Sequence, residues 1–344
     1  MKRRGLILAA VAVLFALILA SGAALLEWDW HRPYQASAEE KLITIPKGMR
    51  AGQVMEMLIR EGVVRNRVSL KIAFSLFGKP RELKAGTYRF DKPLTPLEVI
   101  EMLNRGEVVY TKVTIPEGLR IEEVARLLAE AGLGREKGFL EVASQPDLVK
   151  DLDPQAGSLE GYLFPDTYLV DPGHSERGVV NAMVKNFRTW WAVRAPDVPE
   201  GLTLHQVVTL ASLVEKETGA PEERGLIAGV FFNRLRLGMP LQTDPSIIYG
   251  EIQAGRYRGF LTREDWTFAS PYNTYLHVGL PPGPICSPGR AALEAVLRPI
   301  SSNYLYFVSR NDGTHAFSRT LAEHNAAVQH YRRSASRRRG GSNQ

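Results

Sequence analysis

The chain has 344 residues, of which 44% are hydrophobic and 23% charged, enough for a sizeable core and two or three domains. Of its formal net charge of +6, residues 1–4 carry +3 and the arginines beyond Tyr331 carry +5, which leaves −2 on the rest. A nucleic-acid-binding protein carries its basic residues on the folded domain, so this distribution argues against nucleic acid as a partner. The single cysteine, Cys286, cannot form an internal disulfide and is expected to be structural.

The first predicted element is an apolar helix. No charged residue occurs from Gly5 to Leu26, and three basic residues precede this stretch. About 20 apolar residues span the hydrocarbon core of a bilayer, and a basic flank favours the cytoplasmic side. We therefore expect a single-pass anchor in the cytoplasmic (inner) membrane, with residues 1–4 in the cytoplasm, 5–26 in the membrane and 27–40 as a linker outside.

Two features bear on whether this segment is retained. Small residues at 20–24 offer a processing site, so a cleaved signal peptide is the alternative. The apolar run is longer than the usual core of a signal peptide, and Trp28 and Trp30 suit the membrane interface. A retained anchor is favoured, and both alternatives place the rest of the chain on the extracytoplasmic (periplasmic) side.

The segment after the linker contains a repeat with an offset of 70 residues, because Thr44–Arg50 aligns with Thr114–Arg120. Each copy predicts a short strand, a Pro-x-Gly turn and a helix that stops at a glycine. Between the copies, Gly86–Phe90 has the pattern of a strand, and Thr95–Glu98 that of a helix start with proline at its first position.

These elements predict a strand–helix–helix–strand module at residues 41–110, followed by a second repeat unit and a connection at 111–200. A module of this order resembles the LysM family, which binds the N-acetylglucosamine backbone of peptidoglycan and chitin. The alternative is a strand–turn–helix unit that serves only for packing.

Residues 201–331 are predicted to form a mixed α+β catalytic domain, because the elements lack the alternation that a parallel sheet needs. Thr203 is a plausible N-cap for a helix that runs to about Thr218. The further expected elements are a helix at 222–237, a long loop region, a helix at 290–297, a strand at 304–308 and a last helix from about 320. Residues 332–344 are rich in Arg, Ser and Gly and are expected to form a basic disordered tail.

The sequence lacks the short motifs of nucleotide binding, zinc proteolysis, serine hydrolysis and penicillin binding, and its seven histidines are scattered. No metal site and no cofactor are predicted. What remains is carboxylate chemistry. Cleavage of a glycosidic bond needs a carboxylic acid that an apolar setting keeps protonated at neutral pH.

The segment Val214–Thr218 carries two candidate carboxylates at the end of the predicted helix. On a helical wheel, Glu215 falls roughly 70° and Glu217 roughly 90° from the apolar centre, while Lys216 points nearly opposite. Glu215 is the better candidate by a small margin. Periodicity alone leaves open that both glutamates are ordinary exposed residues of a helix end.

Long motifs in a fixed order resemble the MltG (YceG-like) endolytic murein transglycosylase family over about residues 40–330. The predicted membrane anchor followed by a LysM-like module also resembles the architecture of this family. The motifs that carry the resemblance are Leu159–Tyr168, Leu210–Thr218, Val230–Leu235, Met239–Pro245, Ser270–Tyr275, Gly279–Ile285 and Asp312–Ser318.

This resemblance implies a catalytic role for Glu215, the first glutamate of the Val-Glu-Lys-Glu-Thr run. It also implies a lyase reaction, in which the bond between N-acetylmuramic acid and N-acetylglucosamine breaks and a 1,6-anhydromuramyl end forms. One carboxyl can act first as acid to the leaving oxygen and then as base to the sugar's own C6 hydroxyl. The resemblance further implies action on nascent glycan strands, which would terminate their elongation, and peptidoglycan synthases as possible partners.

Polar and aromatic residues of the downstream loops are the candidates for substrate binding. Amides can hydrogen-bond N-acetyl and hydroxyl groups, and aromatic rings can lie against the apolar faces of sugars. The alternative for each is a structural role in its loop, and Asp244 is also considered as a residue that tunes Glu215. The candidates are Gln242, Asp244, Tyr249, Tyr272, Asn273 and Tyr275.

Two other functions stay open from the sequence. One is a hydrolytic muramidase, whose products would have reducing ends. The other is a peptidoglycan-binding scaffold of the wall-synthesis machinery, in which Glu215 is incidental.

Overall fold

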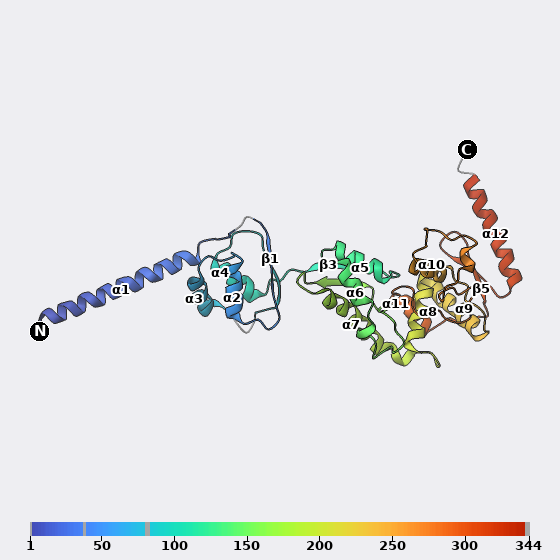
Figure 1. The fold of residues 1–344 in the computed structure, drawn as a ribbon, viewed down its shortest axis with the longest axis horizontal. Helices are drawn as coiled ribbons and strands as arrows, with labels where there is room; N and C mark the ends of the chain where they lie inside the picture. The colour runs from blue at the N-terminus through green and yellow to red at the C-terminus, as the bar shows by residue number, and fades with distance from the viewer. Residues whose placement is uncertain (1, 37–38, 80–82, 341–344) are drawn as a thin grey trace. The chain divides into compact units, whose positions relative to one another are not determined.

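The computed structural model describes residues 2–36, 39–79 and 83–340, and within these the side chains of 2–5 and 334–340 are left aside. The chain divides into two compact units (Figure 1). Unit 1 comprises Met1–Thr111 with Leu169–Gly173, and unit 2 comprises Lys112–Tyr168 with His174–Gln344. Each unit is described by itself. The described elements form a mixed α+β fold with an apolar helix at the N-terminus.

The N-terminal helix α1 spans Lys2–Trp30. Its segment Leu6–Trp30 is long and apolar enough to cross a membrane, and the same composition fits a signal sequence. The helix does not end at residue 26. It continues to Trp30, whose side chain is only 9% exposed and lies in the hydrophobic core of unit 1.

The interfacial position expected for Trp30 is therefore wrong, because Nε1 donates a hydrogen bond of 3.1 Å to the Ser69 carbonyl inside unit 1. The segment after Trp30 is also attached to this unit. The backbone N–H of Tyr34 donates to Leu94 at 3.0 Å, and that of Ala36 donates to Gly62 at 3.0 Å. Residues 30–36 thus belong to the fold of unit 1 rather than to a free linker.

Unit 1 runs strand, helix, helix, strand and helix, and its second helix, at 67–77, was not among the elements named from the sequence. Strands β1 and β2 pair antiparallel, with Ile43 opposite Tyr88, and Ile43 and Ile45 turn alternate side chains into the core. The last helix begins as predicted, with Thr95 accepting from the Glu98 N–H and Pro96 in the first turn. The elements are β1 (Lys41–Ile45), α2 (Ala51–Arg60), α3 (Arg67–Phe77), β2 (Gly86–Phe90) and α4 (Pro96–Arg105).

The repeat seen in the sequence is present in the structure. In unit 2, β3 and α5 reproduce the strand, turn and helix of β1 and α2. Both helices close with a glycine in the left-handed region, Gly62 at φ 71° and Gly132 at φ 74°. The elements of this part of the chain are β3 (Thr111–Ile115), α5 (Ile121–Glu130), α6 (Glu136–Ala143), η1 (Pro146–Leu148), β4 (Asp166–Val170), α7 (Glu176–Arg194) and η2 (Ala195–Asp197).

Helix α8 (Leu204–Glu217) is the central element of the C-terminal part and packs against α9 (Arg224–Arg236), α10 (Asp244–Gln253) and α11 (Arg290–Leu297). It begins at the predicted N-cap, where Thr203 and Gln206 form a capping box. Its valines and the leucines at 210 and 213 are fully buried, and each contributes about 1.5–3 kcal/mol to folding. The remaining elements are η3 (Pro221–Glu223), η4 (Asp265–Thr267), the hairpin of β5 (Tyr306–Ser309) with β6 (His315–Ser318), and α12 (Leu321–Gly340).

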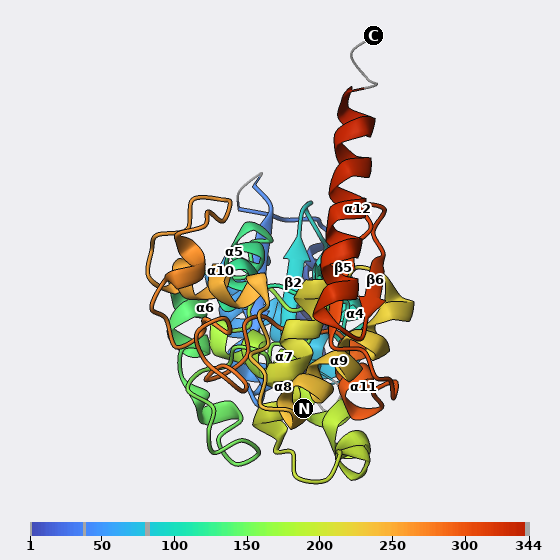
Figure 2. The same ribbon diagram turned by 90° about the vertical axis from the view of Figure 1, so that its right-hand side faces the viewer.

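Two expectations differ from this part of the structure. The long loop expected after residue 238 contains α10, because Pro245 occupies the first turn of a helix rather than a reverse turn. The tail expected to be disordered from residue 332 is helical as far as Gly340, in α12, which stands beside β5 and β6 (Figure 2). Arginine and alanine are good helix formers. Residues 341–344 lie outside the described residues.

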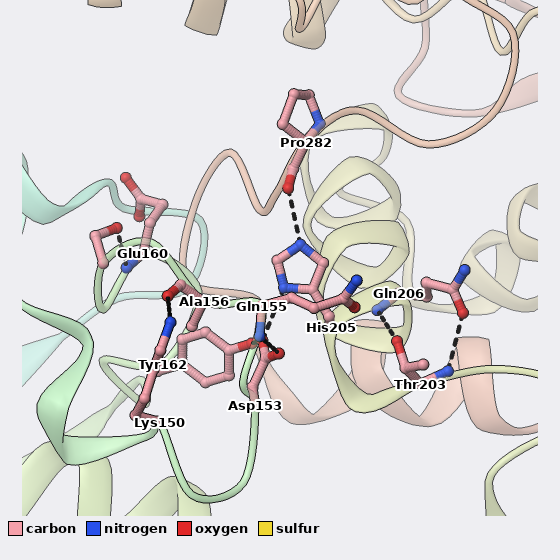
Figure 3. Close-up of polar contacts among 11 residues, drawn as sticks. Lys150, Asp153, Gln155, Ala156, Glu160, Tyr162, Thr203, His205, Gln206 and Pro282 are labelled. Atoms are coloured by element: carbon pink, nitrogen blue, oxygen red, sulfur yellow. Dashed lines mark hydrogen bonds and ion pairs between the residues drawn. The ribbon is translucent and has the colours of Figure 1, made fainter.

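A buried polar network fixes the loop around Pro282 to the start of α8 (Figure 3). His205 Nδ1 lies 2.7 Å from Asp153 Oδ2, and Nε2 lies 2.8 Å from the carbonyl oxygen of Pro282. Because a carbonyl oxygen only accepts, Nε2 carries the hydrogen of the second bond. The hydroxyl of Tyr162 also donates to Asp153. The loop that leads to Ile285 and Gly289 therefore has a fixed starting point.

Candidate active site

The C-terminal turn of α8 presents three charged side chains in different directions. Lys216 is exposed, and its Nζ donates to the Gly118 carbonyl at 3.2 Å. Glu215 and Glu217 turn inward. The helix ends directly after them because Thr218 adopts an extended conformation. Both glutamates predicted from the helical wheel are thus partly buried, and neither is a fully exposed surface residue.

Glu215 is bound tightly by its neighbours. Its side chain is 7% exposed, its Oε2 accepts from the Gly289 N–H at 3.0 Å, and Arg224 Nη2 lies 3.6 Å from its Oε1. Burial raises the pKa of Glu215, and the charge of Glu117 adds to this, while the Gly289 N–H and the Arg224 guanidinium oppose it. Burial with a raised pKa is what an acid at this position requires. Two donors, however, favour its ionised form.

Glu217 has a different environment. Burial raises its pKa to about 7, and the nearby charge of Asp244 acts in the same direction. The Thr243 hydroxyl and the Arg234 guanidinium partly offset this rise. A carboxyl with a pKa near 7 is protonated in a substantial fraction of molecules at neutral pH, which suits a general acid.

A cavity of about 340 Å³ opens at Glu217. Arg234 forms part of its wall and is fixed by carbonyl oxygens, with Nε donating to Leu305 at 2.7 Å and Nη1 donating to Leu241 at 2.8 Å. The guanidinium also lies 5.1 Å from the centre of the Tyr306 ring. A positive charge is therefore held rigidly beside the acidic group. The polar residues of the wall are Glu217, Arg234, Gln242, Asp244, Tyr275 and His324.

Three of the six predicted substrate-binding residues line this cavity, namely Gln242, Asp244 and Tyr275. The Tyr275 hydroxyl donates to Asp244 Oδ1 at 2.7 Å. The backbone of Gln242 has a φ of 52°, which is rare for a residue other than glycine. This conformation is held by the Gln242 N–H, which donates a hydrogen bond of 3.1 Å to the Thr274 carbonyl. Asp244, considered as a residue that tunes Glu215, acts on the pKa of Glu217 instead.

The other three residues do not line this cavity. Asn273 is fully buried, and its Nδ2 donates to the carbonyls of Trp266 and Phe268 at 3.1 and 2.9 Å, so its amide organises the loop. The Tyr249 ring lies 4.7 Å from that of Tyr272. The Tyr249 hydroxyl donates to Glu160 Oε2 at 3.4 Å, and Tyr249 lines a second cavity.

Two further residues were not predicted: His324 lines the cavity, and Trp266 contacts one of its lining residues. The ring of His324 stacks on Tyr306 at 5.3 Å, and no hydrogen-bond partner of its Nδ1 is found among the described residues. Burial and the charge of Arg234 lower the pKa of His324, which favours the neutral imidazole. Trp266, 39% exposed, stacks on Tyr275 at 6.2 Å and offers a face for a sugar ring. Neither residue stands near Glu217 in the sequence, so no spacing pattern indicated them.

This arrangement can support acid–base chemistry on a polar substrate. It combines one carboxyl with a raised pKa, one fixed guanidinium, and amide, imidazole and hydroxyl groups that can bind sugar hydroxyls. Such a set fits cleavage of a glycosidic bond with Glu217 as the acid. Asp244 is a second carboxylate in the same wall and accepts from the Tyr275 hydroxyl.

Comparisons with known proteins agree with a site that cleaves glycosidic bonds. Residues 43–330 match the sequence profile of the YceG-like family. The endolytic murein transglycosylase of Bacillus subtilis (strain 168) is 30% identical over 306 residues, which cover 84% of each chain. That of Streptococcus pneumoniae serotype 2 is 32% identical over 313 residues, which cover 80% of this chain. These residues are 56% of the pneumococcal protein, so the chain spans about half of that relative.

A crystal structure of a YceG-like protein from Listeria monocytogenes superposes with a TM-score of 0.57 at 30% identity, covering 85% of this chain and 100% of that one. The chain therefore belongs to the YceG-like family.

Proposed function

We propose that this protein is a peptidoglycan lytic transglycosylase that cuts glycan strands internally between N-acetylmuramic acid and N-acetylglucosamine. Membership of the YceG-like family and the names of its relatives in Bacillus subtilis and Streptococcus pneumoniae support the reaction class. The observation that carries the proposal is the cavity at the end of α8, where a carboxyl with a pKa near 7 faces fixed polar groups.

The reaction needs one carboxyl in two successive roles. The acid gives its proton to the glycosidic oxygen as the bond to the muramyl C1 breaks, and the N-acetylglucosamine end leaves with a hydroxyl. The carboxylate then takes the proton of the muramyl C6 hydroxyl as O6 bonds to C1, which closes a 1,6-anhydro ring. No water is consumed, and the carboxyl ends in its starting protonation state.

We assign the acid–base role to Glu217, although the family resemblance predicts Glu215. Glu217 lines the cavity together with Gln242, Asp244 and Tyr275. The carboxyl of Glu215 is occupied by the Gly289 N–H and by Arg224, which favour a fixed carboxylate with a role in holding loop 285–289 against α8. The assignment to Glu215 stays a prediction that a pair of variants can decide.

The test is digestion of purified glycan strands by wild type, Glu217→Gln and Glu215→Gln, with mass spectrometry of the new ends. Glu222→Gln is the matched control, because Glu222 is an exposed glutamate just beyond α8. We expect anhydro ends from wild type and control, loss of activity in Glu217→Gln and residual activity in Glu215→Gln. The reverse order of the two variants would return the role to Glu215. A wild type that binds strands without cutting them would favour the scaffold function.

The cellular setting is part of the proposal. The length and apolar composition of α1 and the three basic residues at its start support an anchor in the cytoplasmic membrane with both units outside. The element order of unit 1 supports a LysM-like module that binds the glycan strand, and nascent strands at the membrane would bring peptidoglycan synthases near. Protease accessibility in intact and lysed spheroplasts tests the orientation, since digestion of unit 2 only after lysis would contradict it.

A further inference from the structure

Unit 2 contains a second cavity, of about 570 Å³. It lies next to the cavity at Glu217, because residues adjacent in the sequence line one cavity or the other. Glu217 and Asp244 face the first cavity, whereas Lys216 and Pro245 face the second. The end of α8 and the start of α10 therefore contribute residues to both cavities.

The second cavity combines an apolar floor with a charged edge. Ile248, Ile252 and Ile285 supply aliphatic surface. Tyr249 is held in place by its hydroxyl bond to Glu160, and Tyr257 lines the cavity with a half-buried ring. Such a surface suits a ligand with small aliphatic side chains.

The charges at the edge favour an anionic ligand. Glu123 is already engaged, since its carboxylate accepts from the Arg120 N–H at 2.9 Å and lies 3.3 Å from the Arg120 guanidinium. Lys216 is exposed and uses one bond, to the Gly118 carbonyl, whereas an ammonium has three donors. Lys216 can therefore bind a carboxylate without giving up its present contact.

We propose that this second cavity binds the peptide stem of the glycan substrate, an inference that rests on the proposed function. The stem leaves the muramyl residue sideways through its lactyl group, next to the bond that is cut. It carries alanine side chains and free carboxylates, which match the aliphatic floor and Lys216. A strand without stems keeps only the lactyl carboxylate on each muramyl residue and has no aliphatic side chains to contact the floor of this cavity. The stem thus fixes the register in which the strand enters the cavity at Glu217.

The experiment compares stem-bearing glycan strands with strands whose stems an amidase has removed. The measured quantity is the ratio of kcat/KM for the two substrates. Lys216→Gln removes the charge and keeps a donor for the Gly118 carbonyl, and Tyr257→Ser removes aromatic surface from the second cavity. Lys185→Gln, an exposed lysine on α7, is the matched control. Thermal unfolding of each variant verifies folding.

We expect wild type and Lys185→Gln to prefer stem-bearing strands, and this preference to fall about tenfold in Lys216→Gln, as for loss of one charge-assisted hydrogen bond. We expect it to fall in Tyr257→Ser as well. A wild type without preference, or variants that keep the full preference, would overturn the inference.

If the proposed function itself is wrong, wild type cuts neither substrate, and this result is distinct from a loss of preference between the two substrates. In that case, binding of free stem pentapeptide to the full chain, measured by calorimetry, tests the cavity alone. Binding that is weakened in Lys216→Gln supports the site, and equal binding by both proteins overturns it.

Discussion

Replacing Glu217 by Gln has a consequence for stability that follows from its environment alone. Folding raises the pKa of this carboxyl from 4.5 to about 7, mainly by burial. Between these two values the folded state binds more protons than the unfolded state, so the free energy of unfolding decreases as pH rises. Below about pH 4.5 both states are protonated and this term vanishes.

The size of the term follows from the two pKa values. A rise from 4.5 to about 7 corresponds to about 3 kcal/mol against the folded state above pH 7. Because Glu217 is only partly removed from solvent, this is an upper bound. Glutamine cannot ionise and lacks the term. We therefore expect Glu217→Gln to gain up to about 3 kcal/mol relative to wild type on going from pH 4 to pH 8.

The assay is thermal and chemical unfolding of the full chain in detergent at pH 4 and at pH 8. Comparing the two pH values cancels any pH-independent cost, such as a changed hydrogen bond to Thr243. A gain of 3 kcal/mol raises the melting temperature of a unit of this size by roughly 5–10 °C. Glu222→Gln, at an exposed position, is the matched control. If the unfolding free energies of wild type and Glu217→Gln change in parallel with pH, the conclusion that Glu217 is buried and protonated is refuted.

Three further results are expected. The kcat of wild type falls as pH rises through about 7, because the acid loses its proton, and Glu217→Gln lowers kcat by about 10²–10⁴; a flat profile up to pH 9 would contradict this role. His324→Phe keeps the stacking on Tyr306 but loses the ring nitrogen, so its KM rises severalfold. His324→Asn can still hydrogen-bond and retains more affinity for the substrate. Equal KM values for the two variants would exclude a contact between His324 and the substrate. Asn273→Ala removes the amide that donates to the carbonyls of Trp266 and Phe268 and lowers the free energy of unfolding by about 1–3 kcal/mol, measured by urea titration. An unchanged midpoint would show that the loop does not depend on this amide.

Local signals predicted several elements well. Thr203 with Gln206 three residues later is a capping box, and α8 begins there. The glycines at 62 and 132 end their helices because both adopt a positive φ. The repeat was visible for the same reason, since both copies carry the same turn and helix-stop residues. Such signals act within a few residues and do not depend on tertiary contacts.

The site was less accessible to sequence reasoning. Helical periodicity ranked Glu215 and Glu217 almost equally, because it reports the face of α8 and not what packs on that face. The difference between them comes from distant segments: Gly289 binds one carboxylate, and Asp244 and Arg234 surround the other. Position Trp30 illustrates the same limit, since an amphipathic ring suits a membrane interface and a protein core equally well.

The reaction class itself is tested most directly by digesting glycan strands in water enriched in ¹⁸O and weighing the new ends. If the C6 hydroxyl is the nucleophile, the muramyl products are lighter than hydrolysis products by one water and contain no ¹⁸O. Muramyl ends that carry one ¹⁸O atom would show that water attacks C1, and the protein would then be a hydrolytic muramidase rather than a lytic transglycosylase.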